Sequence, residues 1–307
     1  MRPAGHKLPD LFKAYMRDEH RTDEWKKKVP LRWNKYIQYA GEDTDISSYS
    51  RDDARAYRDA LELPDAKGLR VKSSTVDRHI KQIAAIWNKG LRELGVTTRN
   101  PFESIRATPL DDSDQREVFT PEEFKELLLA CIAQGDDIRS LYALMIVTGA
   151  RNSEAVGLRR CDVFLDVPVP HIAIEPWGPH KLKTKNSRRT VPLHPKVLPL
   201  MQAQMNATEG GVALFPRYSD GVEAKPDADS FSGAINKWLA SVFGNRDRTA
   251  YSSRHTVKDL LRNANIPDDR QRAITGHGSQ SQADTYGHGR ALELKRDDLF
   301  MALSCLG

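Results

Sequence analysis

The chain has 307 residues, which is enough for two domains that each bury a core of their own. Lysine and arginine number 47 against 42 acidic residues, a net charge of +5 that suits a polyanionic partner without requiring one. No apolar run approaches the roughly 18 residues of a membrane span, and no signal-like segment opens the chain. We therefore expect a cytoplasmic protein that does not associate with membranes.

The cysteines and the paired aspartates indicate neither a disulfide framework nor a metal site. The cysteines have no C-x-x-C spacing and are typical of reduced thiols: Cys131, Cys161 and Cys305. The paired aspartates lie in loop-like or cap-like contexts, where solvated surface acids are expected: Asp111-Asp112, Asp136-Asp137, Asp268-Asp269 and Asp297-Asp298. The sequence therefore implies no metal and no cofactor.

Residues 8–95 have helical periodicity almost throughout. Apolar residues recur at helical spacing, among them Leu11, Tyr15, Trp33, Tyr36 and Ile37. A capping box of Ser50 and Asp53 predicts the start of one helix, and another is expected from about Ser74 to Gly95. These patterns predict a helical domain over residues 1–107, whose aromatic side chains are expected mainly to pack its core.

Residues 108–118 lack periodicity and are rich in polar and turn residues, which is typical of a linker. The second domain is therefore expected over residues 119–307. It opens with Thr120 as N-cap and Pro121 at the first helical position. The next helix, about residues 138–148, is apolar nearly all round and must be buried.

The period changes after residue 162. Residues 171–175 and 188–193 read as two strands joined by a basic, turn-rich segment. Helices follow, among them 231–243, and residues 293–303 have the pattern of a short amphipathic helix. The predicted fold class is mainly α with a small antiparallel β-sheet, within the α+β class.

Two stretches concentrate side chains that could bind or attack a phosphate. The first is TGARNSEAVGL, residues 148–158; the second begins at Tyr251 with YSSRH and continues through Gly276-His277 to Tyr286. Tyr251 and Arg254 lie one helical turn apart, so both can face one ligand. The turn-rich residues between His277 and Tyr286 can bring those two side chains together.

In this order and spacing, TGxRxxE, YxxRH, GH and a tyrosine nine residues later, the motifs resemble the phage integrase or tyrosine recombinase family. The resemblance extends over roughly residues 8–300. It implies that Arg151 and Arg254 bind the phosphate, that His277 hydrogen-bonds it and that Tyr286 is the nucleophile. It also implies a helical core-binding domain followed by a catalytic domain.

The basic segment KTKNSRRTVPL resembles the family's β-hairpin, whose lysine is the general acid. The match assigns this role to Lys183, with Lys185 as the competitor. Tyr251 departs from the family pattern, in which histidine is usual at this position. A phenol donates a hydrogen bond but shuttles protons poorly near neutral pH, so a general base at this position is in doubt.

The chemistry explains the residue types. A guanidinium matches paired phosphate oxygens and stays cationic, so that two arginines can stabilise the charge that grows in the transition state without a metal. A phenol is a better leaving group than an alkyl hydroxyl, so a phosphotyrosyl bond can be resealed by DNA. Glu154 is expected to support Arg151. His255, about 100° around the helix from Arg254, is expected to face elsewhere, and both His255 and His288 are expected to be structural.

The resemblance implies a site-specific recombinase that cleaves and rejoins double-stranded DNA through a 3′-phosphotyrosyl intermediate, in integration or excision of a mobile element. It implies a homotetramer on paired sites, a monomer when free, and accessory DNA-bending proteins as further partners. The alternatives are a type IB topoisomerase and a DNA-binding protein that has lost cleavage. An arm-binding domain does not fit ahead of Leu8, so the protein is either of the simpler type or a fragment.

The C-terminal residues leave two arrangements open. The amphipathic helix expected at 293–303 could fold back on its own domain or dock on a neighbouring protomer. In the second arrangement, deletion of residues 291–307 is expected to leave a folded monomer that binds DNA but does not assemble.

Overall fold

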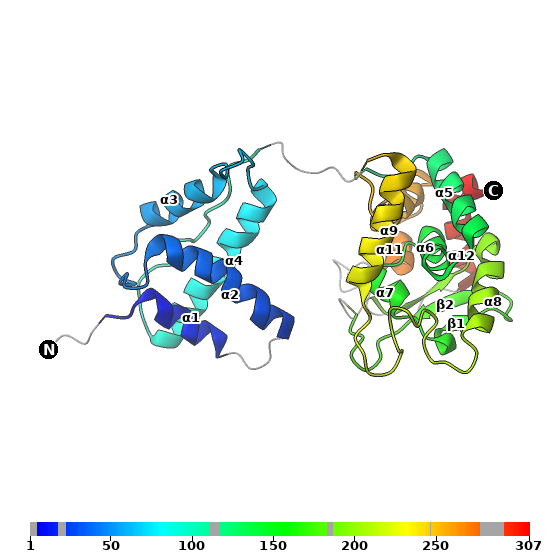
Figure 1. Cartoon of the computed structure of the whole chain (residues 1–307), viewed down its shortest axis with the longest axis horizontal. Coiled ribbons are helices and arrows are strands. Elements are labelled where there is room, and N and C mark those ends of the chain that lie inside the picture. Colours follow the sequence, from blue (N-terminus) through cyan, green and yellow to red (C-terminus); the bar gives the residue numbers. More distant parts are fainter. Residues whose placement is uncertain (1–4, 18–22, 111–116, 183–186, 246, 277–291) are drawn as a thin grey trace. The chain divides into compact units, whose positions relative to one another are not determined.

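The computed structural model describes residues 5–17, 23–110, 117–182, 187–245, 247–276 and 292–307. The chain divides into two compact units, Met1–Gln115 and Arg116–Gly307 (Figure 1). No described helix is both long enough and apolar enough to cross a membrane. The predicted domain limits at residues 107 and 119, and the DNA-binding role of the first domain, remain predictions.

The N-terminal unit is built from α-helices: α1 (Leu8–Met16), α2 (Asp23–Ala40), α3 (Arg51–Glu62) and α4 (Ser73–Leu94). Local signals set two of the limits. The Ser50 hydroxyl accepts a hydrogen bond from the Asp53 amide at 3.2 Å, and the Asp53 carboxylate accepts one from the Ser50 amide at 2.8 Å, so the predicted capping box is confirmed. Gly95 ends α4 at a φ of 66°, in the left-handed region that favours glycine.

Tyr36 lies at the centre of the N-terminal core. Its ring contacts those of Trp33, Tyr57 and Phe102 at centroid distances of 5.0–5.4 Å, and Trp87 donates its indole N–H to the Tyr36 hydroxyl. Burial raises the pKa of the Tyr36 phenol, which therefore stays neutral. These aromatic side chains are buried and pack the core of the N-terminal unit, as expected.

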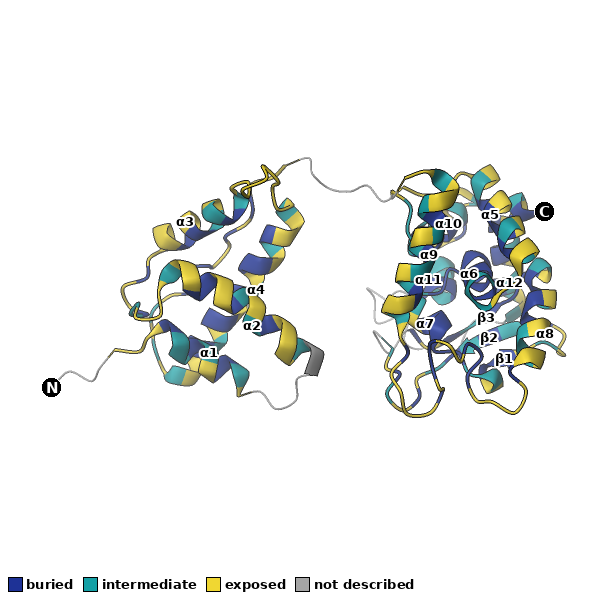
Figure 2. Cartoon of the chain, in the orientation of Figure 1, coloured by how far each residue is buried: buried dark blue, intermediate teal, exposed yellow. Residues whose placement is uncertain are grey.

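The second unit holds the remaining helices and a sheet. The helices are α5 (Pro121–Gln134), α6 (Asp137–Thr148), α7 (Asn152–Val156), α8 (Leu198–Ala207), α9 (Ala228–Phe243), α10 (Ser252–Asn263), α11 (Asp268–Thr275) and α12 (Leu292–Ala302). Thr120 caps α5 with Pro121 at its first position, as predicted. Residues 140–148 of α6 are all buried, which confirms the fully internal helix (Figure 2).

The sheet has three antiparallel strands in the order β1 (Val163–Phe164), β2 (His171–Ile174) and β3 (Arg189–Pro192). In the register of β2 and β3, Ile172 pairs with Val191 and Ile174 with Arg189. The two predicted strands are confirmed and β1, only two residues long, was not predicted. The observed fold is the predicted one, mainly helical with a small antiparallel sheet.

Helix α12 packs on its own unit. Leu299 of α12 is fully buried there, as are Leu303 and Leu306 just after the helix, and the Lys295 ammonium donates to the Thr190 carbonyl of β3 at 3.2 Å. Asp298 forms a two-point ion pair with Arg270 of α11. The expectation that Asp298 is a solvated surface acid is wrong, because this pairing compensates its burial.

Candidate active site

Arg151 lies where α6 gives way to α7. Gly149 caps α6 at a φ of 61°, and a Cβ there would come within 3.0 Å of Val257 on α10, so the turn needs glycine for both its conformation and its space. Arg151 then caps α7. Its amide donates to the Glu154 carboxylate at 2.9 Å and its guanidinium donates to the other oxygen at 2.5 Å. The prediction that Glu154 supports Arg151 is confirmed.

Arg254 is fully buried in the first turn of α10. Its guanidinium donates to the Gly149 carbonyl at 2.6 Å and to the Thr275 carbonyl at 2.5 Å. The first of these bonds joins the two motif stretches across 105 residues. Burial, with a further contribution from Arg151, lowers the pKa of Arg254 to about 10, which still leaves the group cationic at neutral pH.

The C-terminus of α11 is the common support of the arginines. The carbonyl of Thr275 accepts from Arg254, and that of Gly276 accepts from Arg151 at 3.0 Å. The C-terminal end of a helix carries partial negative charge, which suits guanidinium groups. The sequence reading did not identify α11, because its eight residues offer no apolar stripe and begin with two aspartates taken for surface acids.

A third arginine belongs to this cluster and was missed from the sequence. Arg189, at the start of β3, donates to both oxygens of Glu154 at 3.2 and 2.9 Å and to the Ile274 carbonyl at 2.7 Å. Its side chain is 3% exposed. An arginine inside the strand pattern RRTVPL was the available signal, since an unpaired charge is not expected in a buried strand.

Glu154 is held in its charged form by its two arginine partners. Burial alone would raise the pKa of this carboxyl, but Arg189 and Arg151 outweigh burial and lower it to about 2. The carboxylate is therefore ionised at every working pH. It fixes two guanidinium groups in place, as a buried acceptor with its hydrogen bonds satisfied.

Tyr251 and His255 form one contact at the start of α10. The Tyr251 ring is partly exposed and meets the His255 ring edge-on at 4.9 Å. Tyr251 also lies close enough to Arg254 to interact with its charge, as expected for residues one turn apart. His255 follows Arg254 by one position, about 100° around the helix, and its expected structural role stays a prediction.

Lys183, Lys185, His277, Tyr286 and His288 lie outside the described residues. Residues that directly flank the segments 183–186 and 277–291 do contact the arginine cluster. The Ser187 hydroxyl, at the end of the predicted hairpin, accepts from the Arg151 guanidinium at 3.3 Å. The Gly276 carbonyl, directly before His277, accepts from the same guanidinium.

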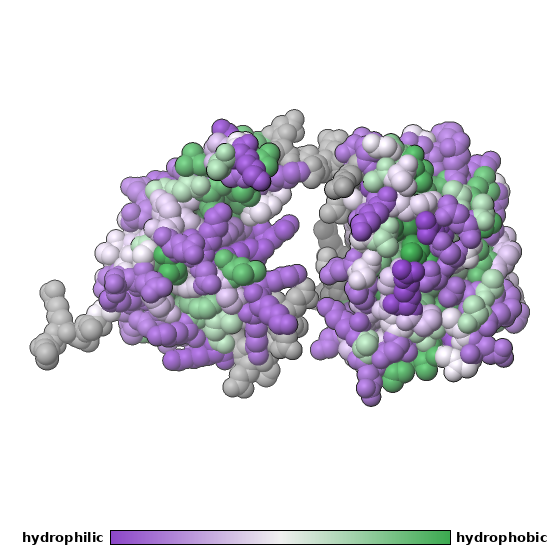
Figure 3. Space-filling view, viewed as in Figure 1, coloured by the Kyte–Doolittle hydropathy of each residue, from purple (hydrophilic) through white to green (hydrophobic). Residues whose placement is uncertain are grey.

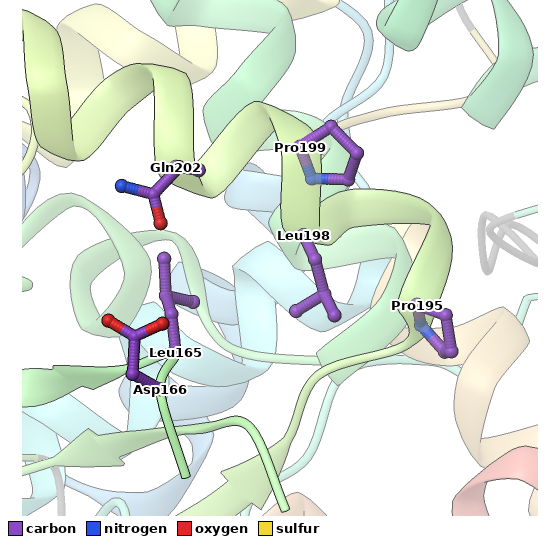
Figure 4. A pocket seen from close by; sticks show the side chains of 6 residues that line it. All are labelled: Leu165, Asp166, Pro195, Leu198, Pro199 and Gln202. Atoms are coloured by element: carbon purple, nitrogen blue, oxygen red, sulfur yellow. The ribbon is translucent and has the colours of Figure 1, made fainter.

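A pocket elsewhere on this unit has different chemistry. It lies between the end of β1 and the start of α8, and Figure 4 shows its lining: Leu165, Asp166, Pro195, Leu198, Pro199 and Gln202. This lining offers a carboxylate and no cationic side chain, so it does not suit a phosphate. The described residues contain no group of three or more His, Cys, Asp or Glu side chains that could hold a metal.

Solved structures share this fold. The Tn1549 transposon integrase, solved with a circular intermediate DNA, matches with a TM-score of 0.71 and 18% identity over 95% of this chain and 97% of that one. A lambda integrase dimer bound to a core site matches with a TM-score of 0.64 and 16% identity over 93% of this chain and 78% of that one. These matches show that the chain shares the fold of the two integrases.

Sequence comparison identifies the family. Residues 117–293 match the description "Phage integrase family". A tyrosine recombinase of Thermosipho africanus is 24% identical over 218 residues, which are 68% of this chain and 70% of the relative. The chain belongs to the phage integrase family and is accordingly a tyrosine recombinase, an enzyme of site-specific DNA recombination.

Proposed function

We propose that this enzyme cleaves one strand of double-stranded DNA with the Tyr286 hydroxyl, holds the 3′ end as a phosphotyrosyl ester and rejoins it to a new partner strand. The observation that carries the proposal is the convergence of Arg151 and Arg254 on the C-terminus of α11. Two guanidinium groups from distant motifs are held on neighbouring carbonyls, those of Gly276 and Thr275. Such fixed cations can stabilise the charge that develops on an attacked phosphate.

The remaining roles follow from the motif match and from the described flanking residues. Lys183 would protonate the departing 5′ oxygen, with Lys185 as the alternative, and His277 would hydrogen-bond the phosphate. Tyr251 would donate a hydrogen bond from the position where histidine is usual. Ser187 and Gly276 support this arrangement, because both contact the Arg151 guanidinium and adjoin the segments in question.

The N-terminal unit would grip the duplex. Hydrophilic side chains cover much of the face of this unit seen in Figure 3. Exposed basic residues lie on two of its helices: Lys26, Lys27, Lys28 and Lys35 on α2, and Arg78 and Lys81 on α4. Lys35 on α2 lies close enough to His79 on α4 to lower its pKa, so exposed basic residues of the two helices lie near each other. Phosphate contacts of this kind supply affinity without reading sequence.

The assembly is proposed by analogy with structural neighbours. Lambda integrase has been solved as a tetramer bound to a Holliday junction. Strand exchange between two duplexes needs four active sites, so we propose a homotetramer on paired sites and a monomer when free. Integration or excision of a mobile element, accessory DNA-bending proteins and a cytoplasmic location belong to the same proposal.

A nicked suicide duplex tests the chemistry. The wild-type enzyme should form a covalent complex, and Tyr286→Phe should form none while its DNA affinity stays nearly unchanged, because only the nucleophilic oxygen is lost. A wild-type level of covalent complex in this variant would assign the nucleophile to another tyrosine. Absence of a complex with the wild-type enzyme would favour a DNA-binding protein without cleavage.

A second assay separates recombination from relaxation. The proposed enzyme should exchange strands between two target sites, whereas a type IB topoisomerase would relax supercoiled DNA without exchange. The general acid is tested with a 5′-bridging sulfur, since a thiolate leaves without a proton. This substrate should restore cleavage by Lys183→Ala, and restoration in Lys185→Ala alone would move the role by two residues.

A further inference from the structure

Arg189 contacts the supports of the arginine cluster, although the motif match assigned it no role. It opens β3, and its guanidinium is almost completely enclosed. The described contacts use every nitrogen of the fork. Nε donates to the Ile274 carbonyl, Nη1 to the Ser187 carbonyl and one Glu154 oxygen, and Nη2 to the other Glu154 oxygen. Each nitrogen of Arg189 therefore already serves a partner within the protein.

Arg189 shares one support with Arg151. Glu154 Oε1 accepts from Arg151 Nη1 at 2.5 Å and from Arg189 Nη1 at 3.2 Å. Glu154 Oε2 accepts from the Arg151 amide and from Arg189 Nη2, both at 2.9 Å. The direction of the Arg151 side chain therefore depends on a carboxylate that Arg189 also holds.

Arg189 also shares the second support of the cluster. Three consecutive carbonyls at the end of α11, those of Ile274, Thr275 and Gly276, accept from Arg189, Arg254 and Arg151 in that order. A Cβ on Gly276 would lie 2.5 Å from Arg189 Nη1, so the glycine of the GH motif leaves the space that Arg189 fills.

We propose that Arg189 is a positioning residue for DNA cleavage, which holds Glu154 and the C-terminus of α11 where they aim Arg151 and Arg254 at the scissile phosphate. The inference rests on the proposed function of those two arginines. Without Arg189, Glu154 has one guanidinium left, and the fork of Arg151 turns further toward the carboxylate. A displacement of about 1 Å at such a site can cost about 10²-fold in rate.

Arg188 provides a matched control. It is the preceding residue and also an arginine, but its side chain is 69% exposed and pairs with Glu175 at the surface. The variants are Arg189→Gln, Arg189→Lys and Arg188→Gln. Each is assayed for melting temperature, DNA affinity and the rate of covalent complex formation on a nicked suicide duplex.

Two modified substrates report which step Arg189 serves. In the first, a methylphosphonate replaces the scissile phosphate, which removes the negative charge that the arginines stabilise. In the second, sulfur replaces the 5′ leaving oxygen, which removes the need for a general acid. On the ordinary phosphate Arg189→Gln should be about 10–100-fold slower than wild type, as for other residues that orient a site through its ligands.

The methylphosphonate should shrink that deficit to within about threefold, because misaimed guanidinium groups matter less for an uncharged centre. The sulfur substrate should leave the deficit unchanged. Arg189→Lys keeps the charge and loses the planar fork, so an intermediate deficit is expected. The DNA affinity of the Arg189 variants should stay close to that of the wild type. The rate of covalent complex formation by Arg188→Gln should also stay close to wild type.

Equal deficits of Arg189→Gln on the phosphate and on the methylphosphonate would overturn the inference, as would rescue by the sulfur substrate. If Arg189→Gln does not fold, Arg189→Lys decides, and wild-type cleavage by this variant overturns the inference. The proposed function fails by a different result, a covalent complex that persists in Tyr286→Phe or is absent from the wild-type enzyme.

Discussion

At the scale of single residues, the candidate site depends on one buried carboxylate between guanidinium groups. Glu154 is 3% exposed and accepts hydrogen bonds from Arg151 and Arg189. Because its pKa falls from 4.5 to about 2 on folding, the ionised form contributes to stability. That contribution is present above pH 4.5 and is lost as the pH falls through about 2, since the unfolded chain takes up the proton first.

Glu154→Gln should therefore lower the free energy of unfolding of the second unit by about 3 kcal/mol at neutral pH, because the buried Arg189 and the partly buried Arg151 lose their counter-charge. The difference in the free energy of unfolding between Glu154→Gln and the wild type should become about 2 kcal/mol smaller when the pH is lowered from 7 to 3. Urea unfolding followed by circular dichroism measures both. The exposed Glu126→Gln is the control, and a difference that does not change with pH would contradict the assignment.

His79 provides a second test at this scale, in the N-terminal unit. Its imidazole contacts the Tyr57 hydroxyl at 2.8 Å, and burial, together with Lys35 and Arg32, lowers its pKa from 6.5 to about 4. A depressed histidine pKa means that the folded state holds the neutral ring. Its contribution to stability is present above pH 6.5 and is lost as the pH falls toward 4.

We expect α4 amides to lose about 1–2 kcal/mol of hydrogen-exchange protection between pH 7 and pH 5, after correction for intrinsic exchange rates. His79→Gln should remove most of this dependence on pH, whereas the exposed His6→Gln should retain it. Identical pH profiles in wild type and His79→Gln would show that another group titrates.

At the scale of elements, α12 is part of the core of its own unit. Leu299, Leu303 and Leu306 are fully buried, and Asp298 is paired with Arg270. Of the two arrangements expected from the sequence, the structure has the one in which the helix folds back on its own domain. Deletion of residues 291–307 would uncover this apolar surface, so the expectation of a folded, truncated monomer is not supported.

A pair of substitutions on the C-terminal segment tests this. Leu303→Ala should cost about 2–5 kcal/mol, because it leaves a cavity among fully buried neighbours. Met301→Ala should cost less than about 0.5 kcal/mol, because Met301 is 59% exposed. Thermal unfolding of the two variants gives the comparison, and equal costs would show that the C-terminal segment is not docked on its own unit in solution.

At the scale of the whole molecule, two compact units with separate cores belong to one chain. If the N-terminal unit grips the DNA backbone, affinity for duplex DNA must fall steeply with salt, because each neutralised phosphate releases counterions. Lys35 and Arg78 are the side chains on α2 and α4 to test, since both are exposed, Lys35 acts on the pKa of His79, and Arg78 precedes His79 in the chain.

Replacing Lys35 and Arg78 together with glutamine should reduce the slope of log affinity against log salt by about 2, or about 0.9 for each phosphate contact. Titrations between about 50 and 200 mM salt measure the slope. Lys225→Gln, in an exposed loop of the second unit, serves as the control. An unchanged slope in the double variant would place the DNA on another face of the N-terminal unit.

The sequence by itself determined the features that depend on neighbours along the chain. Ser50, Gly95 and Thr120 begin or end helices through bonds to residues a few positions away, so their effects can be read locally. The resemblance of the motifs to the phage integrase family likewise implied Arg151 and Arg254 as a pair.

Only the tertiary structure decided what binds those arginines. Arg189 meets Glu154 across 35 positions and Ile274 across 85, and the Arg151 bond to Gly276 spans 125. The same holds for Asp298, which was expected at the surface and is buried beside Arg270 of α11, and for Lys295, which is buried beside Thr190 of β3. A buried charge is stable only beside its partner, and chain spacing does not encode which distant partner folding will supply.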